Sequence, residues 1–400
     1  MNILLLTNKI PYPPKDGGAI ATLNMATGLS DSGHQVNVLA VNTSKHFFSP
    51  DQIPEQIRKK ITIAAIHIQT RIQWPMLIWN FLFSGKPYNA VRFQSKLFLD
   101  RLNDLISKEN FDIIQLEGPY LYYCIPLLRQ KTSAKISLRA HNLEHEIWER
   151  RAHQTKNPVI RHYFKILSDR ILRLEKSLIG NIDLLVPISE RDMEGYRKMG
   201  LSCSSLVCPA GLDIRSYPVP PPITGISLFY IGALDWGPNT EGLDWFFDHI
   251  WNRLLVLHPE VTFHIAGRNS HYYFSSKKEI MNVIVEGEVE DAHTFIISHS
   301  VMIVPLLSGS GIRVKVLEGM LLGRAVITTS CGAEGLSVTH KKNIMIGNTA
   351  DEFIEHINTL IASPDMASAI GSEASRYVKE NFDNLVITKK LADFYKDNLI

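Results

Sequence analysis

Short apolar runs alternate with segments of helical periodicity along the whole chain. Residues 3–7 form an apolar run typical of a buried strand, residues 19–32 carry apolar side chains at helical spacing, and a second apolar run follows at 35–41. Further strands are predicted at 111–116, 135–138, 183–188, 227–231, 261–266, 283–285 and from 301, with a helix at 241–257. This alternation predicts an α/β fold of doubly wound parallel sheets.

A dense proline cluster divides the chain near its middle. Residues 217–222 read Tyr-Pro-Val-Pro-Pro-Pro, which is typical of an extended, stiff linker. Because 400 residues exceed one ordinary core, we predict two Rossmann-like domains, an N-terminal one at 1–215 and a C-terminal one at 216–380. The last segment, 381–400, is predicted to be a helix that packs back on the N-terminal domain.

The composition narrows the class of protein. The chain is 45% hydrophobic and 20% charged, with a formal net charge of +2, so it has no basic surface of the kind that binds nucleic acid. Its four cysteines are scattered and predict reduced thiols. The first residues lack a basic segment and a long apolar run. We therefore expect a cytoplasmic protein.

An aromatic and apolar segment lies at residues 74–83, between Arg71 and Lys86. Ten residues are too few to span a bilayer. We favour core packing of a helix and loop. The other interpretation is an interfacial patch that contacts lipid or a lipid-linked acceptor, because Trp and Phe with basic flanks suit the membrane boundary. On that interpretation the protein is peripheral at the inner membrane face.

Loops rich in glycine follow the predicted strands of the C-terminal domain. Because the carboxyl ends of parallel strands meet at one edge of a sheet, these loops predict a nucleotide site. Without the full G-x-G-x-x-G pattern, a dinucleotide is not favoured. The candidate residues in these loops are Gly232, Gly267, Arg268, Gly287, Val289, Gly309, Ser310 and Gly311.

A helix is predicted directly after the last of these loops, and it carries Arg313, Lys315 and Glu318. Free backbone N–H groups and positive side chains suit a phosphate, while a carboxylate suits a vicinal diol. Together they describe the diphosphate and ribose of a nucleotide. The alternative is an ordinary surface helix on which Lys315 and Glu318 form an ion pair.

Two features of the N-terminal domain also follow predicted strands. Gly17 and Gly18 lie in the loop after the first strand, where they allow backbone to approach a substrate, although Asp-Gly-Gly is also a good turn. His141 lies just past the strand at 135–138. It could donate a hydrogen bond to a sugar hydroxyl or assist proton movement, or it could bond only to local backbone.

These features give the chain a recognisable likeness. It resembles retaining glycosyltransferases of family 4, of the GT-B architecture, most strongly from residue 229 to 336 and within a GSGIRVKVLE subgroup. The motifs are the opening strand with its Gly-Gly loop, LRAHNLE at 138–144, IGALDWGPN at 231–239, IAGR at 265–268, and GIRVKVLEGM at 311–320 with GAEG at 332–335.

The resemblance implies two domains that face each other across a cleft, a nucleotide-diphospho-sugar donor on the C-terminal domain and an acceptor on the N-terminal domain. Glu318 would bind the donor ribose, Arg313 and Lys315 would neutralise the diphosphate, and His141 would contact the transferred sugar. The implied reaction transfers a sugar to a glycan, lipid-linked or small-molecule hydroxyl with retention of configuration, as in polysaccharide biosynthesis. No D-x-D occurs, so no metal or other cofactor is expected.

Two departures from the family pattern fall on donor contacts. Ser310 stands where the family usually has its first glutamate, and the loop at 232–239 lacks the usual Arg and Lys. Two alternatives therefore stay open: a non-catalytic sugar-nucleotide-binding homologue, and a nucleotide-sugar 2-epimerase. The second would need a pair of carboxylates around the donor, which the sequence does not indicate.

Overall fold

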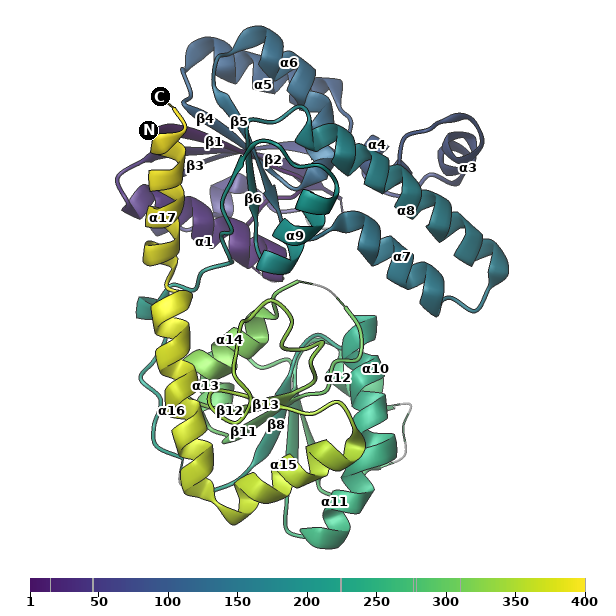
Figure 1. Ribbon diagram of the computed structural model, residues 1–400, viewed down its shortest axis with the longest axis vertical. Coiled ribbons are helices and arrows are strands. Elements are labelled where there is room, and N and C mark those ends of the chain that lie inside the picture. The colour runs from purple at the N-terminus through teal and green to yellow at the C-terminus, as the bar shows by residue number, and fades with distance from the viewer. Residues whose placement is uncertain are drawn as a thin grey trace. The chain divides into compact units, whose positions relative to one another are not determined.

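The computed structural model describes residues 1–14, 16–44, 47–223, 225–275, 277, 279–309 and 311–399. They form two compact units (Figure 1): unit 1 comprises Met1–Leu212 and Asn384–Ile400, and unit 2 comprises Asp213–Asp383. Each unit contains a parallel sheet with helices packed against it. The predicted fold class, two Rossmann-like α/β domains, is confirmed.

Unit 1 is built on a seven-stranded sheet in the order β3-β2-β1-β4-β5-β6-β7, with every pairing parallel. Its strands are β1 (Asn2–Thr7), β2 (Gln35–Thr43), β3 (Thr62–Ile68), β4 (Ile113–Glu117), β5 (Lys135–Ala140), β6 (Leu184–Pro187) and β7 (Ser204–Ser205). Its helices are α1 (Gly17–Asp31), η1 (Pro50–Gln52), α2 (Glu55–Arg58), α3 (Trp74–Phe83), α4 (Tyr88–Val91), α5 (Lys96–Lys108), η2 (Pro119–Cys124), α6 (Ile125–Lys131), α7 (Glu144–Gln154), α8 (Pro158–Ile179), α9 (Glu190–Lys198) and α17 (Asn384–Asp397).

Both faces of the central strands of the unit 1 sheet are buried, as the continuous apolar runs predict. Along β1, Leu4 and Leu6 enter the core that α5, α6 and α8 cover, while Ile3 and Leu5 enter the core that α1 and α17 cover. All four side chains are fully buried. A strand that is buried on both faces lies in the interior of the sheet, and β1 lies between β2 and β4. The loop after β1 lies at the carboxyl edge of the sheet.

The C-terminal helix α17 belongs to unit 1, as predicted. It packs against α1, and the backbone N–H of Asn384 donates to Leu212 O at 2.9 Å. Tyr395 is fully buried, and its hydroxyl bonds to Gln115 and Ser137 in the middle of the sheet. The end of the chain is therefore part of the unit 1 core.

Unit 2 has a six-stranded parallel sheet in the order β10-β9-β8-β11-β12-β13. Its strands are β8 (Leu228–Ile231), β9 (Phe263–Ala266), β10 (Val283–Gly287), β11 (Val301–Val304), β12 (Ala325–Thr328) and β13 (Met345–Ile346). Its helices are η3 (Ile214–Ser216), α10 (Gly237–Phe246), the π-helix η4 (Phe247–Trp251), α11 (Asn252–Leu257), α12 (Ser270–Ser275), α13 (Ala292–Ile297), α14 (Val314–Leu321), α15 (Ala350–Ala362) and α16 (Pro364–Asn381).

Residues 144–179 form two antiparallel helices, α7 and α8, because Asn157 caps a new helix whose first residue is Pro158. Two other helical segments differ from the sequence prediction. Helix α14 begins at Val314, so Arg313 is its N-cap residue and the glycine loop ends before the helix. Core packing of residues 74–83, the interpretation that we favoured, is wrong for most of α3, whose large apolar side chains are mainly exposed.

Candidate functional site

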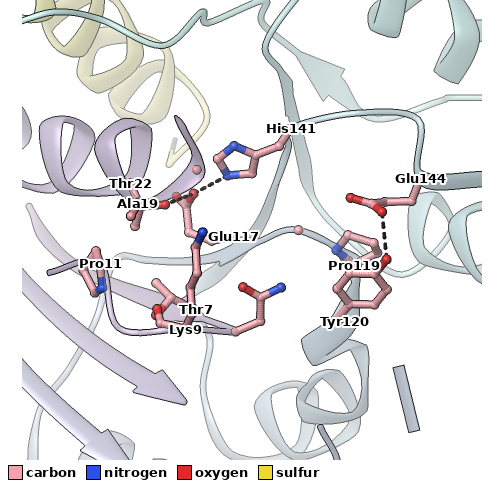
Figure 2. A pocket seen from close by; sticks show the side chains of 13 residues that line it. Thr7, Lys9, Pro11, Ala19, Thr22, Glu117, Pro119, Tyr120, His141 and Glu144 are labelled. Carbon is pink, nitrogen blue, oxygen red and sulfur yellow. Dashed lines mark hydrogen bonds and ion pairs between the residues drawn. The ribbon is translucent and has the colours of Figure 1, made fainter. Parts of the chain in front are cut away.

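The two halves of the predicted site lie in different units, and each is built at the carboxyl edge of its own sheet. In unit 1 a pocket opens where β1 and β4 are neighbours, the point at which the strand order reverses direction. Figure 2 shows its lining. The lining residues are Thr7, Asn8, Lys9, Pro11, Gly18, Ala19, Thr22, Glu117, Gly118, Pro119, Tyr120, His141 and Glu144.

Glu117, the last residue of β4, organises one side of this pocket. Its carboxylate accepts hydrogen bonds from His141 Nε2 at 2.7 Å and Thr22 Oγ1 at 3.1 Å, and forms an ion pair with Arg139 Nη1 at 3.4 Å. Arg139 is fully buried. Burial raises the pKa of Glu117, but the charge of Arg139 and the bond from His141 outweigh burial and lower it to about 2. Glu117 is therefore a carboxylate at neutral pH.

The bond to Glu117 sets the chemistry of His141. A carboxylate can only accept, so Nε2 carries a hydrogen and Nδ1 of the neutral ring is an acceptor. The sequence predicted that His141 could donate a hydrogen bond to a sugar hydroxyl. With Nε2 bonded to Glu117, Nδ1 is the ring nitrogen that remains for such a contact, as an acceptor in the neutral ring or as a donor in the protonated ring.

A second carboxyl group lines the same pocket in a different state. Glu144, at the start of α7, accepts a hydrogen bond from the Tyr120 hydroxyl at 2.7 Å. Burial raises the pKa of Glu144 to about 7; Tyr120 opposes this rise and the nearby Glu175 adds to it. The pocket thus holds one ionised carboxylate and one that titrates near neutrality.

The predicted glycine pair lies at the amino end of α1. Gly17 and Gly18 are the first residues of the helix, and the side chain of Asp16 caps it by accepting from Ala19 N at 3.0 Å. Gly18 lines the pocket, and an added Cβ there would lie 3.3 Å from Lys9 Nζ. Lys9 itself pairs with Asp16, so the structure adds a cation that the sequence analysis did not select.

In unit 2, the glycines after β8 and β9 bring two loops into direct contact. Gly267 has φ 129°, and a Cβ on it would lie 2.1 Å from Gly232 O. A Cβ on Gly232 would lie 3.0 Å from Lys315 Nζ. Gly267 N also donates to Gly287 O at 2.7 Å. Three of the predicted glycines therefore meet at this edge, where side chains would not fit.

Lys315, in the first turn of α14, lies beside Gly232. Its Nζ donates to Tyr230 Oη and to Asn239 Oδ1, both at 2.9 Å, and lies 4.3 Å from the centroid of the Tyr230 ring. Burial, and secondarily the charge of Arg313, lowers its pKa to about 7. An anion bound beside Gly232 would favour the protonated form of Lys315.

Arg313 is 6% exposed and is held by the protein around it. Its Nη1 donates to Gly311 O at 2.5 Å, and its Nη2 lies 4.0 Å from Glu334 Oε2. A Cβ on Gly309 would lie 3.1 Å from Nη2. Arg313 therefore supports the glycine loop that we predicted to bind phosphate. Ser310, the remaining candidate in that loop, lies outside the described residues.

Glu318, one turn after Lys315, has its own partners. Its Oε1 accepts a hydrogen bond from Tyr217 Oη at 3.1 Å and lies 3.9 Å from His293 Nε2. The ring centroids of Tyr217 and His293 lie 4.2 Å apart. The hydrogen bond and the charge of Glu318 raise the pKa of His293. Because Lys315 and Glu318 contact different partners, the alternative of a simple ion pair between them is not what the structure contains.

The last predicted residues lie at the outer strands of unit 2. Arg268 forms a two-point ion pair with Asp235, with Nε–Oδ2 3.2 Å and Nη2–Oδ1 3.0 Å. Val289 is half-buried in the segment between β10 and α13. The sequence analysis missed Tyr230, Asn239, Tyr217 and His293, although Asn239 ends the motif at 231–239. Within the described residues, no group of three or more His, Cys, Asp or Glu side chains is arranged to hold a metal ion.

Comparisons with known proteins bear on both units. Residues 225–363 match the model of one family, described as "Glycosyl transferases group 1". That segment contains every predicted donor-binding residue. A Klebsiella pneumoniae protein described as "Uncharacterized 44.6 kDa protein in cps region" is 22% identical over 415 residues, covering 99% of both chains.

Solved structures share the fold over the whole chain. Sucrose-phosphate synthase from Thermosynechococcus elongatus matches with a TM-score of 0.72 and 15% identity, covering 99% of both chains. Anabaena HepE in complex with UDP matches with a TM-score of 0.72 and 15% identity, covering 99% of this chain and all of that one. S. aureus TarM in complex with fondaparinux, α-GlcNAc-glycerol and UDP matches with a TM-score of 0.69 and 11% identity, covering 98% of this chain and 99% of that one. The likeness establishes the GT-B fold.

Proposed function

We propose that this chain is a metal-independent, retaining glycosyltransferase. Unit 2 binds a nucleotide-diphospho-sugar donor and unit 1 binds the acceptor, a glycan or a lipid-linked or small-molecule hydroxyl compound. The observation that carries the proposal is the position of Lys315, a cation whose Nζ would meet a Cβ on Gly232 at 3.0 Å, at the strand edge where such folds bind nucleotides. The family match over 225–363 supports it.

The proposed donor site assigns separate work to the residues of α14. Lys315 would face the diphosphate, Arg313 would hold the Gly309–Gly311 loop and add positive charge, and the Glu318 carboxylate would accept hydrogen bonds from the ribose diol. Fixed cations of this kind stabilise the negative charge that develops on the leaving phosphate. UDP is the first nucleotide to test, because HepE was solved with UDP and with UDP-glucose.

In the proposed reaction, the bond between the anomeric carbon and the phosphate oxygen breaks and the acceptor oxygen bonds to that carbon on the same face. The acceptor proton passes to the leaving phosphate. His141 would contact the transferred sugar through Nδ1, its ring held by Glu117. A lipid-linked acceptor would bring the enzyme to the inner membrane face.

Calorimetric titration with UDP, GDP and ADP, each with and without EDTA, tests the donor half. We expect one of the three nucleotides to bind, and EDTA to leave its affinity for the protein unchanged. Glu318→Ala should weaken that affinity at least tenfold, because a charged hydrogen-bond acceptor is lost. Glu355→Ala, on the exposed face of α15, is the matched control. Equal nucleotide affinity in wild type and Glu318→Ala would contradict the proposed site.

Sugar transfer itself is tested by incubating the protein with diphospho-sugars of the nucleotide that binds, together with sugar and lipid-linked acceptors. The expected product has the anomeric configuration of the donor, which proton NMR of the product reads directly. Inversion would exclude the retaining mechanism while leaving sugar transfer intact. Nucleotide-sugar binding with no turnover across these acceptors would favour the non-catalytic alternative.

A further inference from the structure

Helix α3 of unit 1 buries a polar side chain and exposes apolar ones. Asn80 is 3% exposed, whereas Trp74, Trp79 and Phe83 are 70%, 61% and 72% exposed. Met76, Ile78 and Leu82 of the same helix are exposed as well. The ring centroids of Trp79 and Phe83 lie 6.2 Å apart, and Trp74, Ile78 and Leu82 follow one another at four-residue spacing, which places them on one side of the helix. An exposed apolar surface of this kind is typical of a binding face.

This orientation is imposed by α8. Arg170 of α8 donates from Nη1 to Asn80 O at 3.2 Å and from Nη2 to Phe81 O at 2.8 Å, near the carboxyl end of α3. The Phe81 ring also lies 5.7 Å from the Tyr163 ring of α8. Figure 1 shows α3 beside α8 at the edge of unit 1. Because these bonds fix the helix, its apolar side chains are held outward.

Positive charge is concentrated around the same helix. Residues 62–99 and 150–168 together contain nine Lys and Arg and no Asp or Glu, although the rest of the chain has seven more acidic than basic residues. Arg71 and Lys86, on either side of α3, are exposed. Arg161 and Lys165 of α8, next to Tyr163, are exposed too. The apolar face therefore has a basic surround.

We infer that α3 and the first half of α8 form a docking surface for an anionic lipid bilayer. Trp and Phe side chains suit the interface between headgroups and acyl chains, and nearby Lys and Arg attract anionic headgroups. A second copy of the chain would bring like charges together, which disfavours a dimer across this face. Among the helices that the structure describes, none combines the length and apolar character needed to cross a bilayer.

Co-sedimentation with lipid vesicles tests the inference without any assay of sugar transfer. The probes are phosphatidylcholine vesicles, alone or with about one-third phosphatidylglycerol. We expect the protein to bind the anionic vesicles and binding to weaken from about 0.1 M to about 0.5 M salt. Trp79→Ser with Phe83→Ser should lower the partition coefficient at least tenfold, because two large apolar groups no longer enter the interface.

Controls separate lipid binding from general effects. Tyr272→Ser removes an aromatic ring that is 81% exposed in unit 2 and should bind vesicles like wild type. Arg161→Ser with Lys165→Ser should weaken binding to anionic vesicles roughly fivefold per charge. Circular dichroism and thermal melting establish that the variants fold.

Three outcomes would overturn the inference. The first is no binding of wild type to either kind of vesicle, and the second is unchanged binding by the Trp79 and Phe83 double variant. The third is a dimer of wild type that the same double variant abolishes, which would assign the face to a second copy. None depends on nucleotide binding by unit 2, so the proposed function succeeds or fails separately.

Discussion

Replacing Glu117 with glutamine removes the charge that balances a fully buried arginine. Burial raises the pKa of Glu117, and Arg139 and His141 lower it by more, to about 2 against an ordinary 4.5. That difference corresponds to about 3 kcal/mol of stability at neutral pH. Since the folded-state pKa is depressed, this contribution is present above about pH 4.5 and is lost as pH falls through about 2. Breaking a buried pair has a similar cost, roughly 3–5 kcal/mol.

The assay is urea unfolding of wild type and Glu117→Gln at pH 7, where we expect the free energy of unfolding to fall by about 3 kcal/mol. The isosteric substitution preserves shape, so the loss reports charge. Retention of the wild-type value within about 1 kcal/mol would refute the reasoning, because Arg139 would then not need the carboxylate.

Glu144→Gln is the matched control in the same pocket. Burial raises the pKa of Glu144 to about 7, so the folded protein favours the neutral carboxyl. The stability from this preference is complete below the ordinary pKa of 4.5 and is lost as pH rises through about 7. At pH 8 the free energy of unfolding of Glu144→Gln should therefore be no lower than that of wild type. A loss equal to that of Glu117→Gln would show that burial, not charge, governs both positions.

Three further predictions concern other parts of the chain. Lys315→Met should slow sugar transfer by about two orders of magnitude. Because burial lowers the pKa of Lys315 to about 7, the nucleotide affinity of wild type, measured by calorimetry, should decline above pH 7. Lys315→Arg should show no such decline. Gly267→Ala should lower the melting temperature sharply, because its Cβ would lie 2.1 Å from Gly232 O. Tyr395→Phe should lower the free energy of unfolding of unit 1 by about 1–3 kcal/mol, since its hydroxyl has two buried partners.

Each of these predictions has a matched control. Lys379→Met, on the exposed face of α16, should leave turnover and its pH profile unchanged. Gly237→Ala adds a Cβ in open space and should melt like wild type. Tyr272→Phe removes a hydroxyl from an 81% exposed ring and should be neutral. A nucleotide affinity that is flat with pH in wild type, or an unchanged melting temperature in Gly267→Ala, would contradict the local geometry described here.

The sequence alone determined the fold class. Its continuous apolar runs predicted strands buried on both faces, and their alternation with helices predicted parallel sheets. The return of the last helix to unit 1 was also predictable, because the segment follows the end of the second series of strands. Strand ends predicted where glycines would gather, and Gly232, Gly267 and Gly287 do meet at one edge. These are properties of local periodicity, which a sequence displays directly.

Only the tertiary structure decided which side chains meet. Glu117 contacts His141 because β4 and β5 are neighbours in the sheet, and Lys315 contacts Tyr230 because α14 lies beside the end of β8. The exposure of α3 has the same origin: its periodicity suited a core helix, but Arg170, about ninety residues later in the chain, holds its polar face inward. Burial and charge pairing depend on contacts between distant segments, which spacing along a chain does not specify.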